Sequence, residues 1–312
     1  MLGVGLRLTL QVGRRTGGHG PGSGKVLVFA MLGQSNMIGR SNFDGGPNHP
    51  DGVQQWGRTG AAGGTLIPAT IPLDHVDPGP THMGLDISFA EAVLAERPGT
   101  CVIFVPGAEG GTGFQTGHWR PGDVRYDDAV QRVNDAMAAL PGAHLAGILW
   151  HQGESDVGNA AYQSDLDALV VGLRQDITAA GPTTPFVVGG LVPGWVQLDS
   201  ARQAVQAVLE GTPTRVPHTG FASTAAITGA GTDIHFTAAD LRALGTQYAA
   251  AWRAVAAPQP IGQIPSQTDL AAETGPGAPP AASAPIPDQT DPQGMTPPQV
   301  HAPIPDQQDT LS

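Results

Sequence analysis

The stretch Lys25–Met37, KVLVFAMLGQSNM, combines an apolar run with a short polar turn. The first eight residues, Lys25–Leu32, are almost all apolar and show no helical periodicity, which predicts a strand buried on both faces. Gly33-Gln34-Ser35-Asn36-Met37 follows at once, so the strand is expected to end in a tight turn with Ser35 exposed on it.

The same alternation of apolar runs and helical patterns continues along the chain. Further buried strands are predicted at Thr100–Val105, His144–Trp150 and Phe186–Leu191. Helices are predicted at Ile87–Glu96, Tyr126–Leu140, Tyr162–Ala180, Ser200–Leu209 and Thr237–Val255. Strands without alternation, separated by helices, indicate an α/β fold with a parallel sheet covered on both faces. Ligands in such folds bind beyond the carboxyl ends of the strands.

Three regions are predicted, with boundaries set by shifts in composition. Residues 1–24 form an apolar docking segment followed by a glycine-rich linker, and residues 25–257 form the globular domain. Residues 258–312 hold 13 of the 29 prolines, six acidic residues and no Lys, Arg or aromatic residue, so a disordered tail is expected. The pattern I-P-x-Q-x-D occurs three times in the tail, at residues 264, 286 and 304. Low-complexity drift and a three-copy docking motif for a protein partner both fit this repetition.

Charge and composition exclude several classes of protein. The chain has 15 Lys and Arg against 27 Asp and Glu, a net charge of −12, which argues against nucleic-acid binding. Its one cysteine, Cys101, excludes a disulfide framework and a cysteine-based metal cluster. The sequence contains no run of 18 apolar residues, so no membrane span is predicted. At the N-terminus the arginine pair follows the apolar stretch, whereas a signal peptide has its charged residues first. A cytoplasmic location, or a place in a phage-like particle, is therefore expected.

Polar clusters stand at the ends of the predicted strands and before the last helix. They are Gly33–Met37, Pro106–Thr112, His151–Asp156 and Thr232–Phe236. A serine on a tight turn, a histidine near a carboxylate and glycine N–H groups are the parts of an acyl-transfer site. Each cluster alone also has a simple structural interpretation, since Ser35 and Asp233 could cap helices and Gly110-Gly111 could be a turn. Four clusters at the ends of one sheet favour catalysis.

The residues of these clusters resemble the signature blocks of the sialate O-acetylesterase-like SGNH hydrolases. The matching blocks begin at Gly33 (GQSNM), Ala108 (A-x-GGT), Trp150 (WHQGE-x-D) and Asp233 (D-x-HF), in the family's order. The resemblance covers about residues 25–257. It implies a three-layer α/β/α sandwich with a flavodoxin-like parallel sheet, and activity as a carbohydrate acetylesterase that requires no metal or other cofactor.

The resemblance also implies a role for each matching residue. Ser35 corresponds to the nucleophile, and its N–H to one oxyanion donor. Gly111 corresponds to the second donor, with Gly110 as the alternative, and the amide of Gln152 is the candidate third donor. His235 corresponds to the general base.

The acidic residues of the site are less well defined by the resemblance. Many relatives place an aspartate three residues before the histidine, but here Thr232 holds that position and Asp233 is two residues before His235. Asp233 is the candidate third member of a triad, and a backbone carbonyl that orients the imidazole would give a dyad instead. Glu154 and Asp156 correspond to residues that brace the loop after the third strand.

The segment Ser41–Met83 is long and rich in glycine and proline. Loops of this length in compact domains are usually functional, so it is expected to form one wall of the substrate cleft. Trp56 in this segment and Trp119 are candidates for stacking on a sugar, and burial in a small core is an equally good interpretation of each.

Two functions from different classes remain open at this point. The first is a serine esterase that removes O-acetyl groups from a carbohydrate through an acetyl-enzyme intermediate. The second is a structural or carbohydrate-binding component of a larger assembly, such as a phage tail or envelope particle, that keeps the fold with or without activity. The N-terminal segment and the repeats of the tail would then bind a protein partner.

Overall fold

The structure is a computed structural model that describes residues 25–256. A seven-stranded sheet forms its centre, in the order β4-β3-β6-β1-β7-β8-β9. Its strands are β1 (Val26–Gly33), β3 (Val53–Trp56), β4 (Leu66–Pro68), β6 (Cys101–Pro106), β7 (His144–His151), β8 (Phe186–Gly189) and β9 (Thr219–Ala222). A second sheet pairs β2 (Ser41–Asn42) with β5 (His82–Met83). The predictions for residues 1–24 and 258–312 lie outside the described residues.

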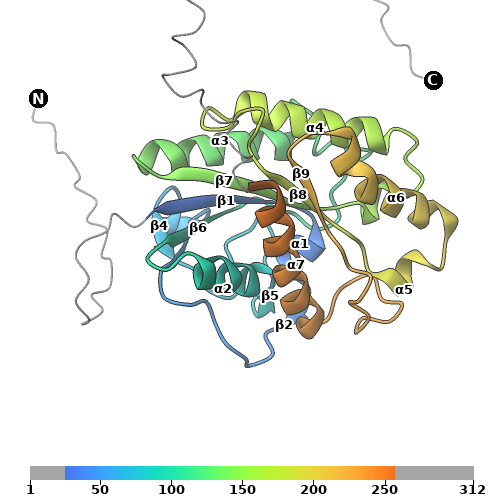
Figure 1. Cartoon of the computed structure of the whole chain (residues 1–312), viewed down its shortest axis with the longest axis horizontal. Helices are drawn as coiled ribbons and strands as arrows, with labels where there is room; N and C mark the ends of the chain where they lie inside the picture. The colour runs from blue at the N-terminus through green and yellow to red at the C-terminus, as the bar shows by residue number, and fades with distance from the viewer. Residues whose placement is uncertain (1–24, 257–312) are drawn as a thin grey trace, which may run out of the picture. The chain divides into compact units, whose positions relative to one another are not determined.

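The helices cover both faces of the sheet, as the α/β prediction requires. They are α1 (Ser35–Ile38), α2 (Asp86–Glu96), α3 (Val124–Ala139), α4 (Tyr162–Asp176), α5 (Pro193–Val196), α6 (Ser200–Arg215) and α7 (Ala238–Ala256). Short 3-10 turns lie at Gly60–Ala62 and Glu154–Asp156. Figure 1 shows α3 and α4 above the sheet and α2 and α7 below it, which gives three layers. No helix within residues 25–256 has the length and apolar character needed to cross a membrane.

One edge of the sheet departs from the prediction of parallel strands. Strand β4 pairs antiparallel with β3, while all other neighbours in the sheet run parallel. Both β3 and β4 fall in the segment Ser41–Met83, which was expected to be a loop. A short connection of nine residues joins them, and such a connection allows only antiparallel pairing because a parallel crossover needs a dozen or more residues. The sheet is therefore mixed.

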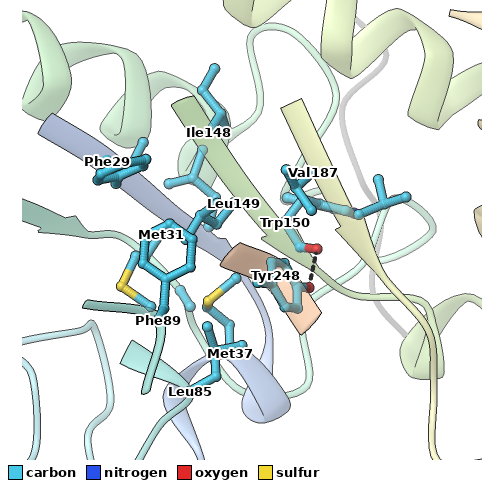
Figure 2. Packing of buried hydrophobic residues seen from close by; sticks show 14 of the residues in the cluster. Phe29, Met31, Met37, Leu85, Phe89, Ile148, Leu149, Trp150, Val187 and Tyr248 are labelled. Carbon is cyan, nitrogen blue, oxygen red and sulfur yellow. Dashed lines mark hydrogen bonds between the residues drawn. The ribbon is translucent and has the colours of Figure 1, made fainter. Parts of the chain in front are cut away.

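Aromatic side chains fill the space between the sheet and the α2–α7 layer. Phe29 of β1 meets Phe89 of α2 edge-on at 4.9 Å between ring centroids, and Trp252 of α7 at 5.2 Å. Figure 2 shows Phe29, Met31 and Phe89 together with Met37 of α1 in this cluster. Because Met37 belongs to the turn that bears Ser35, the core itself anchors the short helix α1.

Gly33 ends β1 at a close approach between two backbones. Its φ is +126°, and a Cβ atom there would lie 2.1 Å from the carbonyl oxygen of His151 in β7. The N–H of Gln34 donates to that same oxygen at 2.9 Å. Only glycine fits both the backbone angle and the space, so Gly33 sets where the chain leaves the sheet.

We expect Gly33→Ala to lower the free energy of unfolding by about 2–4 kcal/mol, because strain and a backbone clash add. Gly142→Ala is the matched control, since Gly142 has a φ of +87° but no atom within 4 Å of its Cβ position. The control should cost only about 1 kcal/mol. Urea denaturation measures both values, and equal losses would contradict the close approach at Gly33.

Candidate active site

Three neighbouring strands deliver the polar clusters to one edge of the sheet. Strand β1 lies between β6 and β7, with Met31 opposite Pro106 and Gly33 opposite His151. The turns that follow these strands therefore meet beside each other. Strands β3, β4 and β6 lie on one side of β1, and the later strands β7, β8 and β9 lie on the other side. Where the order of strands changes direction in this way, a crevice forms at the carboxyl ends of the strands.

Ser35 and His235 lie together in this crevice, although 200 residues separate them. The Nε2 atom of His235 is 3.0 Å from the Oγ atom of Ser35, within hydrogen-bond distance. Ser35 is the first residue of α1, and His235 lies in the loop before α7. The structure thus brings together the two residues that the family resemblance implies are the nucleophile and the base.

Asn36 holds the histidine loop against the serine turn. Its Nδ2 donates to the carbonyl oxygen of Ile234 at 2.9 Å, and its Oδ1 accepts the N–H of Phe236 at 3.2 Å. These two backbone groups flank His235 on either side. The second Nδ2 hydrogen goes to Oε1 of Glu154 at 2.6 Å. One buried amide therefore fixes the position of His235 relative to its neighbour Ser35.

Asp233 does not take the place expected for a triad. Its Oδ1 accepts the backbone N–H of His235 at 2.8 Å, and its side chain is exposed. Among residues 25–256, no aspartate and no backbone carbonyl is hydrogen-bonded to the Nδ1 atom of His235. With only one residue between Asp233 and His235 along the chain, the carboxylate closes a local turn instead. The ring is positioned through its backbone, by Asn36.

The glycine loop after β6 offers one of its two candidate donors. The N–H of Gly110 donates to Oδ1 of Asp77 at 2.9 Å and is therefore occupied. Within the described residues the N–H groups of Gly111 and Ser35 have no partner. Of the two glycines, Gly111 is thus the one with a hydrogen available for an oxyanion.

Gln152 is placed differently from the expected third donor. It is fully buried, and its Nε2 donates to Oδ2 of Asp156 at 2.6 Å and to the carbonyl oxygen of Thr112 at 3.3 Å. An amide nitrogen has two hydrogens, so none is left for an oxyanion. The carboxylate of Asp156 also accepts the N–H groups of Phe114 and Gln115, so it ties the loop after β7 to the loop after β6. Gln152 supports that brace.

Glu154 is a buried carboxylate next to the turn that bears Ser35. Besides the amide of Asn36, it faces Nε2 of His151 at 3.7 Å. Burial alone would raise the pKa of Glu154, but His151 and Asn36 outweigh it and hold that pKa below its usual value. The hydroxyl of Tyr248 donates to the carbonyl oxygen of Trp150 at 2.7 Å (Figure 2). It must then accept from Nδ1 of His151 at 3.0 Å, so that nitrogen holds a hydrogen.

The two tryptophans proposed to stack on a sugar are buried. Trp56 is 5% exposed and Trp119 is 0% exposed, so neither ring can meet a substrate. Trp119 packs edge-on against Trp150 at 4.9 Å, and its Nε1 donates to Thr112 Oγ1. Both are core residues, as the alternative interpretation has it, but they belong to the main hydrophobic core and not to a small separate one. Within residues 25–256, no group of three His, Cys, Asp or Glu side chains lies close enough together to bind a metal ion.

Several residues of the site carry no motif that reveals their role from sequence. Arg40 and Asp77 form an ion pair of 2.6 Å next to the glycine loop. His151 and Tyr248 form the layer below Glu154. His151 stands in the block that begins at Trp150, but nothing in that block indicates its contact with Tyr248, and Arg40, Asp77 and Tyr248 belong to no block.

A serine hydroxyl bonded to a histidine, at the carboxyl end of the central strand of an α/β sheet, is an arrangement that SGNH-like hydrolases share with other serine hydrolases. The chain belongs to the carbohydrate esterase family described as sialic acid-specific acetylesterases, which it matches over residues 25–254. A probable carbohydrate esterase of Arabidopsis thaliana is 27% identical, over 57% of this chain and 73% of that protein.

Solved structures with the same fold include three esterase-related chains. The Arabidopsis thaliana protein has a TM-score of 0.62 at 22% identity, over 73% of this chain and 98% of its own. NanS has a TM-score of 0.60 at 17% identity, over 74% and 96%. A carbohydrate acetylesterase from Xanthomonas citri has a TM-score of 0.55 at 22% identity, over 75% and 57%. At these identities the likeness concerns the fold.

The electrostatics of the site predict a histidine that is neutral at neutral pH. Burial lowers the pKa of His235, Arg40 and His82 lower it further, and the charges of Glu154 and Asp233 oppose them. Because the negative charge of Glu154 favours the imidazolium, Glu154→Gln should lower this pKa again. Asp233→Asn should lower it less, since solvent screens the exposed Asp233. NMR titration of the ring measures both, and a raised or unchanged pKa in Glu154→Gln would contradict this assignment.

Proposed function

We propose that this carbohydrate esterase removes O-acetyl groups from its substrate through a covalent acetyl-enzyme on Ser35. The observation that supports this most directly is the 3.0 Å contact between Ser35 Oγ and His235 Nε2. The lowered pKa of His235 keeps its Nε2 free to accept the serine proton. A structural or carbohydrate-binding role without activity is not favoured, because this contact is intact in a chain of an esterase family.

The proposed reaction proceeds in two halves at the same pair of residues. Ser35 Oγ attacks the acetyl carbonyl carbon while its proton moves to Nε2 of His235. The N–H groups of Ser35 and Gly111, both without a partner in residues 25–256, stabilise the negative oxygen of the tetrahedral intermediate. His235 then gives the proton to the departing sugar oxygen. Water, activated by the same histidine, attacks the acetyl-enzyme and releases acetate.

The substrate class follows from the family and is tested by a screen. O-acetylated sialic acid, acetylated xylan and an O-acetylated bacterial capsule polysaccharide are incubated with the protein, and acetate release is measured. The family description places sialic acid first among them. Release from none of the three, together with no hydrolysis of p-nitrophenyl acetate, would refute the proposed function.

Ser35→Ala should reduce esterase activity on p-nitrophenyl acetate to below about 1% and abolish the pre-steady-state burst of p-nitrophenol, because no acetyl-enzyme forms. The melting temperature should stay nearly unchanged, since the only side-chain partner of Ser35 within residues 25–256 is His235. Ser164→Ala, at an exposed serine of α4, is the control and should keep full activity. A burst that survives in Ser35→Ala would exclude Ser35 as the nucleophile.

Asp233→Asn distinguishes a dyad from a triad. A carboxylate that orients the ring through Nδ1 costs about 10⁴ in kcat when it becomes an amide, as known for serine proteases. Here an asparagine Oδ1 can still accept the N–H of His235, so the loop should keep its shape. We therefore expect a loss of only about tenfold, from the missing charge. A loss near 10⁴ in the steady-state kcat would restore the triad.

A further inference from the structure

The loop after β6 begins as an extension of that strand along β1. The N–H of Gly107 donates to the carbonyl oxygen of Met31 at 2.9 Å, and the N–H of Glu109 donates to that of Gly33 at 3.1 Å. The N–H groups of Gly107 and Glu109 therefore both bind the central strand. The ladder reaches the last residue of β1, directly before the turn that bears the nucleophile.

The alternate N–H groups of the same loop are held from the opposite side. The segment His75–Asp77 runs along this side, and Val76 N–H donates to the carbonyl oxygen of Ala108 at 3.0 Å. The N–H of Ala108 donates to Nδ1 of His75 at 3.1 Å, and the N–H of Gly110 donates to Oδ1 of Asp77 at 2.9 Å. Burial lowers the pKa of His75 to about 4, so its Nδ1 is a free acceptor at neutral pH.

Four consecutive N–H groups, from Gly107 to Gly110, are thus bound in alternation to two sides. In the described part of the chain, the next two N–H groups, of Gly111 and Thr112, have no partner. Asp77 makes the last of the four bonds. It therefore fixes the peptide directly before the N–H of Gly111, which is the first group free to bind a ligand.

Arg40 connects this clamp to the nucleophile turn. It lies two residues beyond α1, and its Nη2 contacts Oδ2 of Asp77 at 2.6 Å while its Nη1 donates to the backbone oxygen of Asp77 at 3.2 Å. A Cβ atom at Gly110 would lie 2.0 Å from Arg40 Nη2 and 2.8 Å from Asp77 Oδ2. The ion pair therefore rests directly on Gly110.

We propose that Asp77, held by Arg40, is a positioning residue that sets the Gly111 N–H at the oxyanion of the reaction on Ser35. The inference rests on the proposed function and assigns to this pair a task that no motif suggests. A carboxylate suits it because one oxygen accepts from the backbone while the other binds the guanidinium. Without Asp77 the Gly110 N–H loses its partner and the following peptide is free to rotate.

The expected kinetic effect follows from when the donor acts. An oxyanion donor bonds most strongly to charge that exists only in the transition state, so its displacement lowers kcat and leaves KM unchanged. Removing such a donor costs about 10²–10³ in kcat, and displacing it should cost less. For Asp77→Ala we expect a loss of about 10–100-fold in kcat. Asp77→Asn keeps one acceptor oxygen and should fall between this variant and the wild type.

The test compares Asp77→Ala with Asp74→Ala, a matched control in the same segment. Asp74 also accepts backbone N–H groups, at 2.6 Å from Arg58 and 3.0 Å from Thr59, but neither donor belongs to the glycine loop. The control should lose stability and keep its kcat within about twofold. An arylboronic acid, which forms an anionic tetrahedral adduct with a serine, provides the second readout. Its Ki should rise in Asp77→Ala by the same factor by which kcat/KM falls.

Three outcomes would overturn the inference. They are an unchanged kcat in Asp77→Ala, a kcat loss without a matching rise in the boronate Ki, and a rise in KM alone, which would make the pair a sugar-binding element. The amide NMR signals of Gly110 and Gly111 are a further readout that needs no activity. They should shift, with faster hydrogen exchange, in Asp77→Ala and not in Asp74→Ala. A wild-type protein that releases no acetate refutes the proposed function, while these signals still decide whether Asp77 is the clamp.

Discussion

The buried amide of Asn36 is the interaction on which the whole site depends. It is 1% exposed, and both of its hydrogens and its oxygen are bound, to Glu154, Ile234 and Phe236. These partners lie 118 to 200 residues away in sequence. A buried amide that lost one of them would be left with an unsatisfied group at a cost of about 1–3 kcal/mol. The histidine loop therefore has one favoured position, and that position places His235 at Ser35.

The charge of Glu154 is stabilised by the amide of Asn36 and by His151, which lies next to it. Tyr248 donates to the carbonyl oxygen of Trp150 and so orders the ring of His151, which in turn faces Glu154. A carboxylate buried without such partners would take up a proton instead of keeping its charge. Because Glu154 raises the pKa of His235 while burial lowers it, the base strength of the site depends on groups that never touch a substrate.

Sequence alone predicts the long elements and the reacting pair, for reasons visible in the residues. Uninterrupted apolar runs such as the one in β1 have one stable location, between two helical layers. Strand β3 is not predicted in this way because it contains the polar residue Gln55. In the structure Gln55 is fully buried, and its amide is hydrogen-bonded to Pro68, Thr70 and Asp74. Ser35 and His235 stand in recognisable blocks. The orientation of Gln152 cannot be predicted, because it depends on a carboxylate that a short turn brings back to it.

The segment between Ser41 and Met83 shows why a long loop need not contact a substrate to serve a site. Its tryptophan is buried, and its ends are closed by the pairing of β2 with β5. The part of the segment beside the crevice is His75–Asp77, which forms hydrogen bonds along one side of the loop after β6. Donors fixed in this way need no reorganisation when charge develops, and this saving is the main source of oxyanion stabilisation. A long loop is usually taken to be mobile, but here the length of the segment lets it reach the glycine loop and hold that loop rigid.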